Sequence, residues 1–535
     1  MKTITIIFLL ALTFECSSQI QEEGTFSQQV WMKTYNGPAS GDDRPEAIAI
    51  DNNENVIVIG TCDILTSDED YVTIKYNSSG DKLWERRYDY NNSKDEAYAV
   101  TTDKSGNIYV TGHSGSSIAT IKYNSSGTIV WEKRYTAPGG GYHEGRSIVV
   151  DTNGNVFIAA RTDHDCTTIK YSTFGVLQWV SRYYAPNSEH NEGTDIGVDA
   201  SGNVYTSGNS YGENSWDFLT MKHNSAGEIQ WVRRYDGPSH SMDILGGFAV
   251  DDIGNIYITG QSRGNATFDD YVTIKYSSDG RQLWLKKYAG PSTSTDEANS
   301  LAIDASGNVY VTGFSDGFET GGRDIATIKY NSAGVQQWLK HYNGEAGNTD
   351  QGTKIVVDIS GNVYVIGSSA GANFDYDYVT IKYNSSGNEK WVRKYSGSRT
   401  DHPLAIAVDK KKNVYVTGFS TSPDLYKDIR TIKYSQNPYA IQNRVGIPNT
   451  FSLSQNYPNP FNPVTKISFS IPNNSYTKLT VYDISGKQVA ELINSELDAG
   501  SYNIDFDASQ FASGTYFYRI TAGNFTEVKK MILVK

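Results

Sequence analysis

A tryptophan recurs about every 50 residues along most of this 535-residue chain, and its spacing constrains the fold more than any other feature. The intervals run from 47 residues, between Trp84 and Trp131, to 54 residues, between Trp284 and Trp338. The complete series is Trp31, Trp84, Trp131, Trp179, Trp231, Trp284, Trp338 and Trp391. A period of this length is typical of stacked supersecondary units that bury a continuous core only together. We therefore expect one repeat array and not a string of separate domains.

Between successive tryptophans lie three further segments that are rich in β-branched and aromatic residues and bounded by turn residues, so each unit is expected to contain four antiparallel strands. Asp-x-x-Gly-Asn turns, as at residues 103–107, join the first strand to the second, and Asn-Ser-Ser-Gly turns, as at 77–80, join the third to the fourth. Both tight turns must then lie on one face, and the longer, variable connections on the other. Variable loops on a rigid scaffold commonly carry binding sites.

Four-stranded units of this period build a β-propeller. Eight third strands resemble Thr-Ile-Lys-Tyr, from Thr73 to Thr431, and the last of them has no tryptophan strand after it. The strand around Trp31, by contrast, precedes any first strand, so it can complete the last blade. We predict an all-β fold: an eight-bladed β-propeller of four-stranded blades over residues 29–436 with N-terminal strand closure, followed by a small β-sandwich.

The two ends of the chain depart from the repeat. Residues 1–18 combine Lys2, an apolar stretch and small residues near Cys16, which is typical of a cleaved signal peptide, and no transmembrane segment is expected after cleavage. Residues 437–449 are rich in Pro and Asn and are expected to be a linker, whereas residues 450–535 alternate as the strands of a sandwich do. Cys62 and Cys166 lie two units apart, too far for a disulfide, and are expected to be free and buried.

Charge and composition exclude several functions. The 47 basic and 60 acidic side chains give a net charge of −13, which argues against a nucleic-acid partner or an anionic membrane surface. The eight histidines show no HExxH motif and no zinc-ligand spacing, so we expect no metal site and no cofactor.

An aspartate three residues before the third-strand threonine recurs seven times, as Asp70, Asp165, Asp217, Asp270, Asp324, Asp377 and Asp428. These carboxylates could line a cation site, but bonding to backbone N–H groups at a strand start is the commoner role of such an aspartate, and we favour that role.

The repeats resemble a known family. Units of the form AIAVDxxGNVYVTG followed by TIKYNSSG are similar to the bacterial propeller repeats called SBBP repeats, over about 400 residues. That resemblance implies an exported propeller without an agreed activity. The end of the chain resembles the C-terminal sorting domain of type IX secretion cargo, through the motifs at 457–463, 482–486, 514–518 and 529–535. It implies recognition by the type IX secretion machinery, passage through the periplasm, and a secreted or outer-surface location.

What distinguishes one unit from another lies mainly in the loops between second and third strands. The aromatic residues there are Trp216, Phe268, Phe318, Phe374, Tyr376 and Tyr426. Exposed aromatic side chains on one rim suit sugar stacking or a protein partner, although packing of each loop onto its own blade explains them equally well.

We therefore expect a non-catalytic binding module for a glycan or a protein, with these six residues as its binding residues and no catalytic residues. The alternative is a propeller enzyme that uses the same face, either a quinoprotein-type oxidoreductase or a carbohydrate-active enzyme. A central pocket lined by non-repeating acids and bases would favour the enzyme.

Overall fold

The computed structural model describes residues 27–39, 41–63, 69–184, 190–212, 215–264, 268–291, 295–318, 322–436, 442–444, 448, 450–473, 475–497 and 499–535. The signal peptide expected at 1–18 and most of the linker expected at 437–449 lie outside these ranges. Every regular element within them is a β-strand. A helix long and apolar enough to cross a membrane is not found in the described part of the chain.

The first four antiparallel sheets, blades 1 to 4, each follow one repeat in chain order. Blade 1 consists of β2 (Asp43–Ile50), β3 (Val56–Asp63), β4 (Glu69–Tyr76) and β5 (Lys82–Tyr88). Blade 2 consists of β6 (Asp95–Thr102), β7 (Ile108–Ser114), β8 (Ser117–Tyr123) and β9 (Ile129–Tyr135). Blade 3 consists of β10 (His143–Val150), β11 (Val156–Thr162), β12 (Asp165–Tyr171) and β13 (Leu177–Tyr183). Blade 4 consists of β14 (Asn191–Val198), β15 (Val204–Tyr211), β16 (Trp216–His223) and β17 (Ile229–Tyr235).

Blades 5 to 7 repeat this order, and blade 8 takes its outer strand from the N-terminal end. Blade 5 consists of β18 (Asp243–Val250), β19 (Ile256–Arg263), β20 (Asp269–Tyr276) and β21 (Gln282–Tyr288). Blade 6 consists of β22 (Asp296–Ile303), β23 (Val309–Phe318), β24 (Gly322–Tyr330) and β25 (Gln336–Tyr342). Blade 7 consists of β26 (Asp350–Val357), β27 (Val363–Ala370), β28 (Tyr376–Tyr383) and β29 (Glu389–Tyr395). Blade 8 consists of β30 (Asp401–Val408), β31 (Val414–Thr421), β32 (Lys427–Ser435) and β1 (Gln28–Tyr35).

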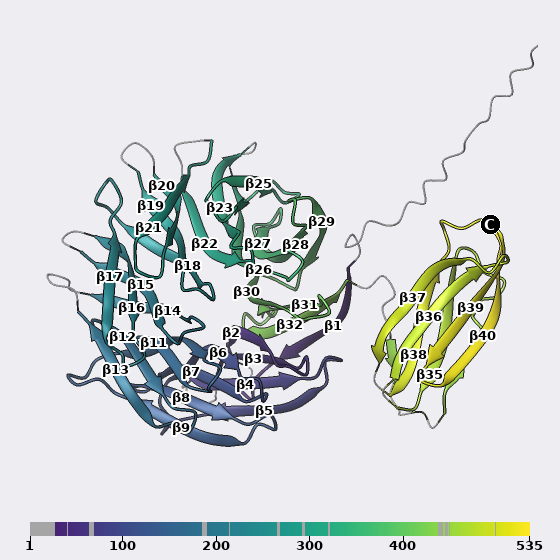
Figure 1. Cartoon of the computed structure of the whole chain (residues 1–535), viewed down its shortest axis with the longest axis horizontal. Coiled ribbons are helices and arrows are strands. Elements are labelled where there is room, and N and C mark those ends of the chain that lie inside the picture. The colour runs from purple at the N-terminus through teal and green to yellow at the C-terminus, as the bar shows by residue number, and fades with distance from the viewer. Residues whose placement is uncertain are drawn as a thin grey trace, which may run out of the picture.

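The blades stand in a circle with their first strands innermost (Figure 1). Strand β1 pairs antiparallel with β32, so that Trp31 lies opposite Lys433 and Tyr35 opposite Ile429. Strand β2 of blade 1 packs in turn against β30 and β31 of blade 8. The all-β propeller fold expected from the sequence is confirmed.

Apolar side chains fill the space between adjacent blades. A strand that is buried on both faces has a hydrophobic residue at almost every position. Ile57 and Ile59 of blade 1, for example, pack with Val110 and Ile121 of blade 2. The outer-strand tryptophans join this core and bond across blades: Trp84 Nε1 donates to the backbone carbonyl of Ser125 at 3.1 Å. Cys62 and Cys166 are free and buried, as expected.

The tight turns show why Asp, Gly and Asn recur. Asp103 accepts the N–H groups of Ser105 and Asn107 with Oδ1, each at 2.9 Å, while Oδ2 accepts the Tyr109 hydroxyl at 2.9 Å. Gly106 between them has a φ of +77°, a conformation that glycine adopts without steric cost. Local hydrogen bonds therefore stabilise these tight turns, as the repeat predicts.

The C-terminal module is a sandwich of two four-stranded sheets. One sheet contains β33 (Gln442–Arg444), β38 (Gly500–Asp507), β35 (Val464–Ile471) and β34 (Ser452–Leu453). The other contains β37 (Gln488–Leu497), β36 (Ser475–Asp483), β39 (Gly514–Ala522) and β40 (Phe525–Leu533). Its core is its own, with Ile467, Val481, Ile504 and Tyr518 fully buried. Strand β33 falls within the segment expected as a linker and pairs with β38 at the sheet edge.

Candidate binding face

The connections between second and third strands, and those from one blade to the next, share one face of the propeller, because the strands of each blade alternate in direction. We call this the long-loop face, and the opposite one the tight-turn face. The second and third strands are separated by two residues in blades 2 and 3, by three in blade 6, and by four or five in blades 1, 4, 5, 7 and 8. The connections on the long-loop face therefore differ in length, and the residues expected to bind lie on blades 4 to 8.

Trp216 begins β16 and is half-buried in an aromatic cluster of its own blade. Its ring meets those of His190 and Tyr211 edge-on, with ring centroids 5.5 Å away in both cases. The Nδ1 atoms of His190 and His164 lie 2.9 Å apart, which requires that one of the two carries the proton. Local packing, the alternative to a binding role, thus accounts for much of the Trp216 ring.

Phe374 has the opposite character. Its side chain is 71% exposed, and its backbone has a φ of +62° within the turn between β27 and β28. In blade 8, Leu425 occupies the matching turn with a φ of +74° and a side chain 63% exposed, next to Tyr426 at 50%. Bulky residues rarely adopt positive φ, and strain of this kind concentrates at functional sites.

A row of rings connects these two blades. Tyr376, the first residue of β28, packs on His402 with centroids 5.1 Å apart, and His402 packs on Phe419 at 5.2 Å. The Lys427 ammonium lies 4.9 Å from the centre of the Phe419 ring. Tyr376 is therefore joined to blade 8.

The remaining two predicted residues, Phe268 and Phe318, lie on blades 5 and 6. Phe268 is exposed, and the Arg263 guanidinium lies 5.7 Å from its ring centre. Phe318 ends β23, where its backbone pairs with Gly322, and its side chain lies outside the described part of the structure. The six predicted residues thus lie on five consecutive blades.

Sequence reasoning missed a second set of side chains on this face. Every first strand carries a β-bulge at the same place, for example between Pro45 and Ala47 in β2. A bulge redirects the side chain at that point. The bulged residues are Glu46, Tyr98, Arg146, Thr194, Gly246, Asn299, Thr353 and Leu404. The first strands vary at several other positions as well, so the sequence did not single out the bulged one.

Three of these bulged residues belong to one polar network on the innermost strands. The Tyr98 hydroxyl donates to Glu96 Oε2 at 2.9 Å, and the Arg146 guanidinium lies 4.8 Å from the Tyr98 ring centre and pairs with Glu144. Glu46 is reached by solvent, yet burial among the surrounding strands raises its pKa to about 7, against the lowering effect of the Arg146 charge. Non-repeating acids and bases therefore gather near the axis of the ring.

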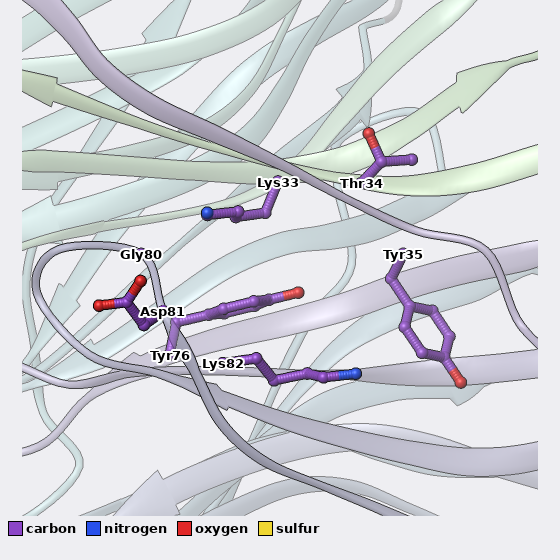
Figure 2. Close-up of a pocket in the computed structure, with 7 residues that line it drawn as sticks. All are labelled: Lys33, Thr34, Tyr35, Tyr76, Gly80, Asp81 and Lys82. Atoms are coloured by element: carbon purple, nitrogen blue, oxygen red, sulfur yellow. The ribbon is translucent and has the colours of Figure 1, made fainter. Parts of the chain in front are cut away.

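A pocket of about 290 Å³ lies elsewhere, where β1 meets blade 1 (Figure 2). Its lining residues are Lys33, Thr34, Tyr35, Tyr76, Gly80, Asp81 and Lys82. Glu85 beside it accepts the Tyr35 hydroxyl at 3.2 Å and pairs with Lys82 at 2.7 Å. At the position of Lys33, blade 1 has Arg86, whose Nε donates to the Gly127 carbonyl at 2.7 Å. The pocket is a contact between neighbouring blades, at a strand position that is lysine or arginine in seven of the eight units.

Comparison with known families agrees with this architecture. A beta-propeller repeat family (SBBP) matches residues 88–118, 130–165, 283–319 and 340–375, and the secretion system C-terminal sorting domain (Por_Secre_tail) matches residues 455–535. The chain is therefore an exported β-propeller protein. It carries SBBP repeats and a type IX sorting domain, which directs it to the cell surface or the medium through the type IX secretion machinery.

Similar solved structures are distant. PorZ, described as an essential bacterial surface component of the type IX secretion system of Porphyromonas gingivalis, is 12% identical, with 93% of this chain and 71% of that chain covered and a TM-score of 0.46. The propeller domain of the Trilobed protease from Pyrococcus furiosus is 10% identical, with 64% and 95% covered and a TM-score of 0.39. Drosophila Plexin A, solved with Semaphorin 1b, is 10% identical, with 76% and 87% covered and a TM-score of 0.38. No curated protein matches the chain.

Proposed function

We propose that this exported propeller is a non-catalytic binding module that holds an extracellular glycan or protein on its long-loop face, over blades 7 and 8. The observation that carries the proposal is the pair of exposed apolar side chains, Phe374 and Leu425, on strained turns of neighbouring blades. The positive φ of a bulky residue costs folding free energy, and an exposed apolar side chain gains little from burial to offset that cost, which favours a role outside folding.

The surroundings of the two turns favour the same role. Tyr376, His402 and Phe419 form a continuous row of rings across the two blades, and Tyr426 is exposed in the turn of blade 8. Rigid rings with polar atoms bind sugars and protein hot spots at a low cost in side-chain entropy.

The tight-turn face has fewer features that favour ligand binding. Phe174, Ile253 and Ile359 are exposed there as single residues of repeat turns, and none of them is among the described residues with positive φ. Isolated exposed apolar residues are common on protein surfaces.

The test starts by screening the full chain on glycan and extracellular-matrix protein arrays. For a ligand so found, Phe374→Asn should weaken binding by about 1 to 3 kcal/mol while leaving the melting temperature unchanged or raised, since Asn accepts positive φ. Ile359→Ala is the control on the opposite face. Loss of binding with Ile359→Ala and not with Phe374→Asn would show that the long-loop face is not the binding face.

The second candidate function is a carbohydrate-active enzyme, and the network around Glu46 is the observation that favours it. A carboxyl group with a pKa of about 7, raised by burial and lowered by the Arg146 charge, has the acidity that a general acid needs near neutral pH. If glycosidase activity is found, Glu46→Gln should abolish turnover and remove the pH-rate limb near 7, whereas Phe374→Asn should affect substrate binding alone.

A further inference from the structure

We propose that calcium binds at two junctions between blades, where three aspartates converge from three segments of the chain. At the junction of blades 4 and 5, these are Asp217 of β16, Asp236 after β17 and Asp243 of β18. At the junction of blades 1 and 2, the equivalent residues are Asp70 of β4, Asp89 after β5 and Asp95 of β6. Within each group, one carboxylate oxygen per residue lies within 4.8 Å of the other two.

A buried oxygen without a partner points to a ligand at each junction. Asp243 is fully buried; its Oδ2 accepts the N–H of Gly237 at 2.6 Å, whereas Oδ1 has no hydrogen-bond partner among the described residues. Burial raises the pKa of Asp243, and the Ser262 hydroxyl beside the carboxylate opposes that rise without reaching hydrogen-bond geometry at Oδ1. A carboxylate oxygen buried without a donor is costly, and a cation would satisfy it.

The second junction has the same arrangement. Asp95 is also fully buried, with Oδ2 accepting the N–H of Tyr90 at 2.7 Å and Oδ1 without a hydrogen-bond partner among the described residues. The same oxygen is unpartnered in the equivalent residues Asp43, Asp296, Asp350 and Asp401, so it is a feature of the repeat, and the two proposed junctions are those in which two further carboxylates stand beside it.

The local charge fits a divalent ion. Arg234 Nη2 lies 2.5 Å from Asp217 Oδ2, and His240 Nδ1 lies 2.6 Å from Asp236 Oδ2 on the exposed side. Lys287 also acts on Asp243, so three carboxylates, one guanidinium and one ammonium leave one net negative charge when His240 is neutral. At the other junction, Arg87 occupies the position of Arg234 and Arg134 that of Lys287, with the Arg134 guanidinium bonded to Ser114 at 2.7 Å. The count of charges there is the same.

The ligand chemistry favours calcium over a transition metal. All three side chains offer carboxylate oxygens, which hard cations prefer, and calcium accepts six to eight oxygen ligands in irregular geometry, water included. Asp236 is exposed, so an ion could enter from solvent. Extracellular calcium modules typically have dissociation constants of about 10⁻⁴ to 10⁻³ M, the range expected here.

The other junctions show what decides the site. The residue directly after the fourth strand is not acidic in them: Asn36, Thr136, Tyr184, Ala289, Asn343 and Ser396. At the junction of blades 5 and 6, Asp296 repeats the arrangement, with Oδ2 accepting the Gly290 N–H at 2.7 Å and Oδ1 without a hydrogen-bond partner. Ala289 is the missing third position, and it is exposed.

Calorimetric titration of the full chain with calcium tests the proposal. Wild type should bind two ions per chain, Asp236→Asn one, and the double variant Asp89→Asn/Asp236→Asn none. Ala289→Asp should gain a third ion, so the test does not depend on loss of function alone. Asp252→Asn removes an exposed carboxylate outside the junctions and should still bind two.

Magnesium at the same concentration should bind at least tenfold more weakly, because it demands a regular octahedral site. The proposal is overturned if calcium binding is absent, if the stoichiometry is unchanged in the Asn variants, or if magnesium binds equally well.

Discussion

Trp31 Nε1 donates a hydrogen bond of 3.1 Å to the backbone carbonyl of Ser78, which lies in the neighbouring blade. Six further tryptophans make the same bond to the turn between the third and fourth strands of the next blade. The indole nitrogen of Trp391 has no hydrogen-bond partner in the described part of the chain. Blade 8 takes its fourth strand from the N-terminal end of the chain, so the turn that would accept this bond is missing.

Replacing Trp31 should destabilise the propeller strongly. The side chain is buried between blades 8 and 1, with its ring centroid 6.1 Å from that of Tyr76 and 6.0 Å from that of Tyr415. We expect Trp31→Ala to lower the free energy of unfolding by about 3 to 5 kcal/mol, measured by urea denaturation. Met32→Ala, a change at a partly exposed position of the same strand, is the control. Deletion of residues 19–35 should be at least as damaging, and an unchanged melting temperature would refute closure by β1.

Glycine at position 387 should be required for a reason beyond its backbone. Gly387 has a φ of +81°, and a Cβ there would lie 2.7 Å from Trp338 Cγ, whereas Gly202, with a φ of +78°, would bring its Cβ near no other atom. Alanine pays a left-handed backbone cost of about 1 to 2 kcal/mol at both positions. Gly387→Ala should therefore lose at least about 1 kcal/mol more than Gly202→Ala, because it also displaces the tryptophan. Equal losses in urea titrations would disprove that packing constraint.

The stability of the propeller should depend on pH through Asp43. Burial raises the pKa of this carboxyl to about 6, with a further contribution from the Asp428 charge, although the Gly37 N–H lowers it. The folded chain keeps a proton that the unfolded chain releases, so the free energy of unfolding falls as pH rises from about 4 to 6. Asn191 occupies the equivalent position in blade 4, which shows that asparagine fits.

Asp43→Asn should accordingly flatten this pH dependence and add about 1 to 2 kcal/mol at pH 7. Melting temperatures at several pH values, with Asp252→Asn as a charge-matched control, measure the effect. A wild-type slope in Asp43→Asn would show that the carboxyl does not titrate in this range.

Deleting residues 450–535 should separate folding from export. The sandwich has its own core, so the propeller should melt as it does in the full chain while the protein stays in the periplasm. Surface labelling of intact cells and fractionation provide the measurement, with the full chain as control. Detection of the deleted form at the cell surface would contradict the sorting role.

The candidate site was only partly accessible from sequence. Trp216, Phe374 and Tyr426 stand out because they interrupt a repeat, but their exposure does not follow from that: Trp216 is largely occupied by its neighbours, whereas Phe374 is open to solvent. The polar network of Tyr98 and Arg146 was missed, because the two residues lie on first strands of different blades and meet only when those blades pack.

The sequence by itself determined the four-stranded unit, its turns and the phase of the repeat. Strand alternation and turn chemistry depend on only a few neighbouring residues, and the same pattern recurs in eight repeats. Only the tertiary structure decided which side chains meet between units. Asp217 and Asp243 lie 26 positions apart and converge at a junction that exists only once two blades pack. Such meetings depend on backbone placement across blades, and no local pattern of residues encodes that placement.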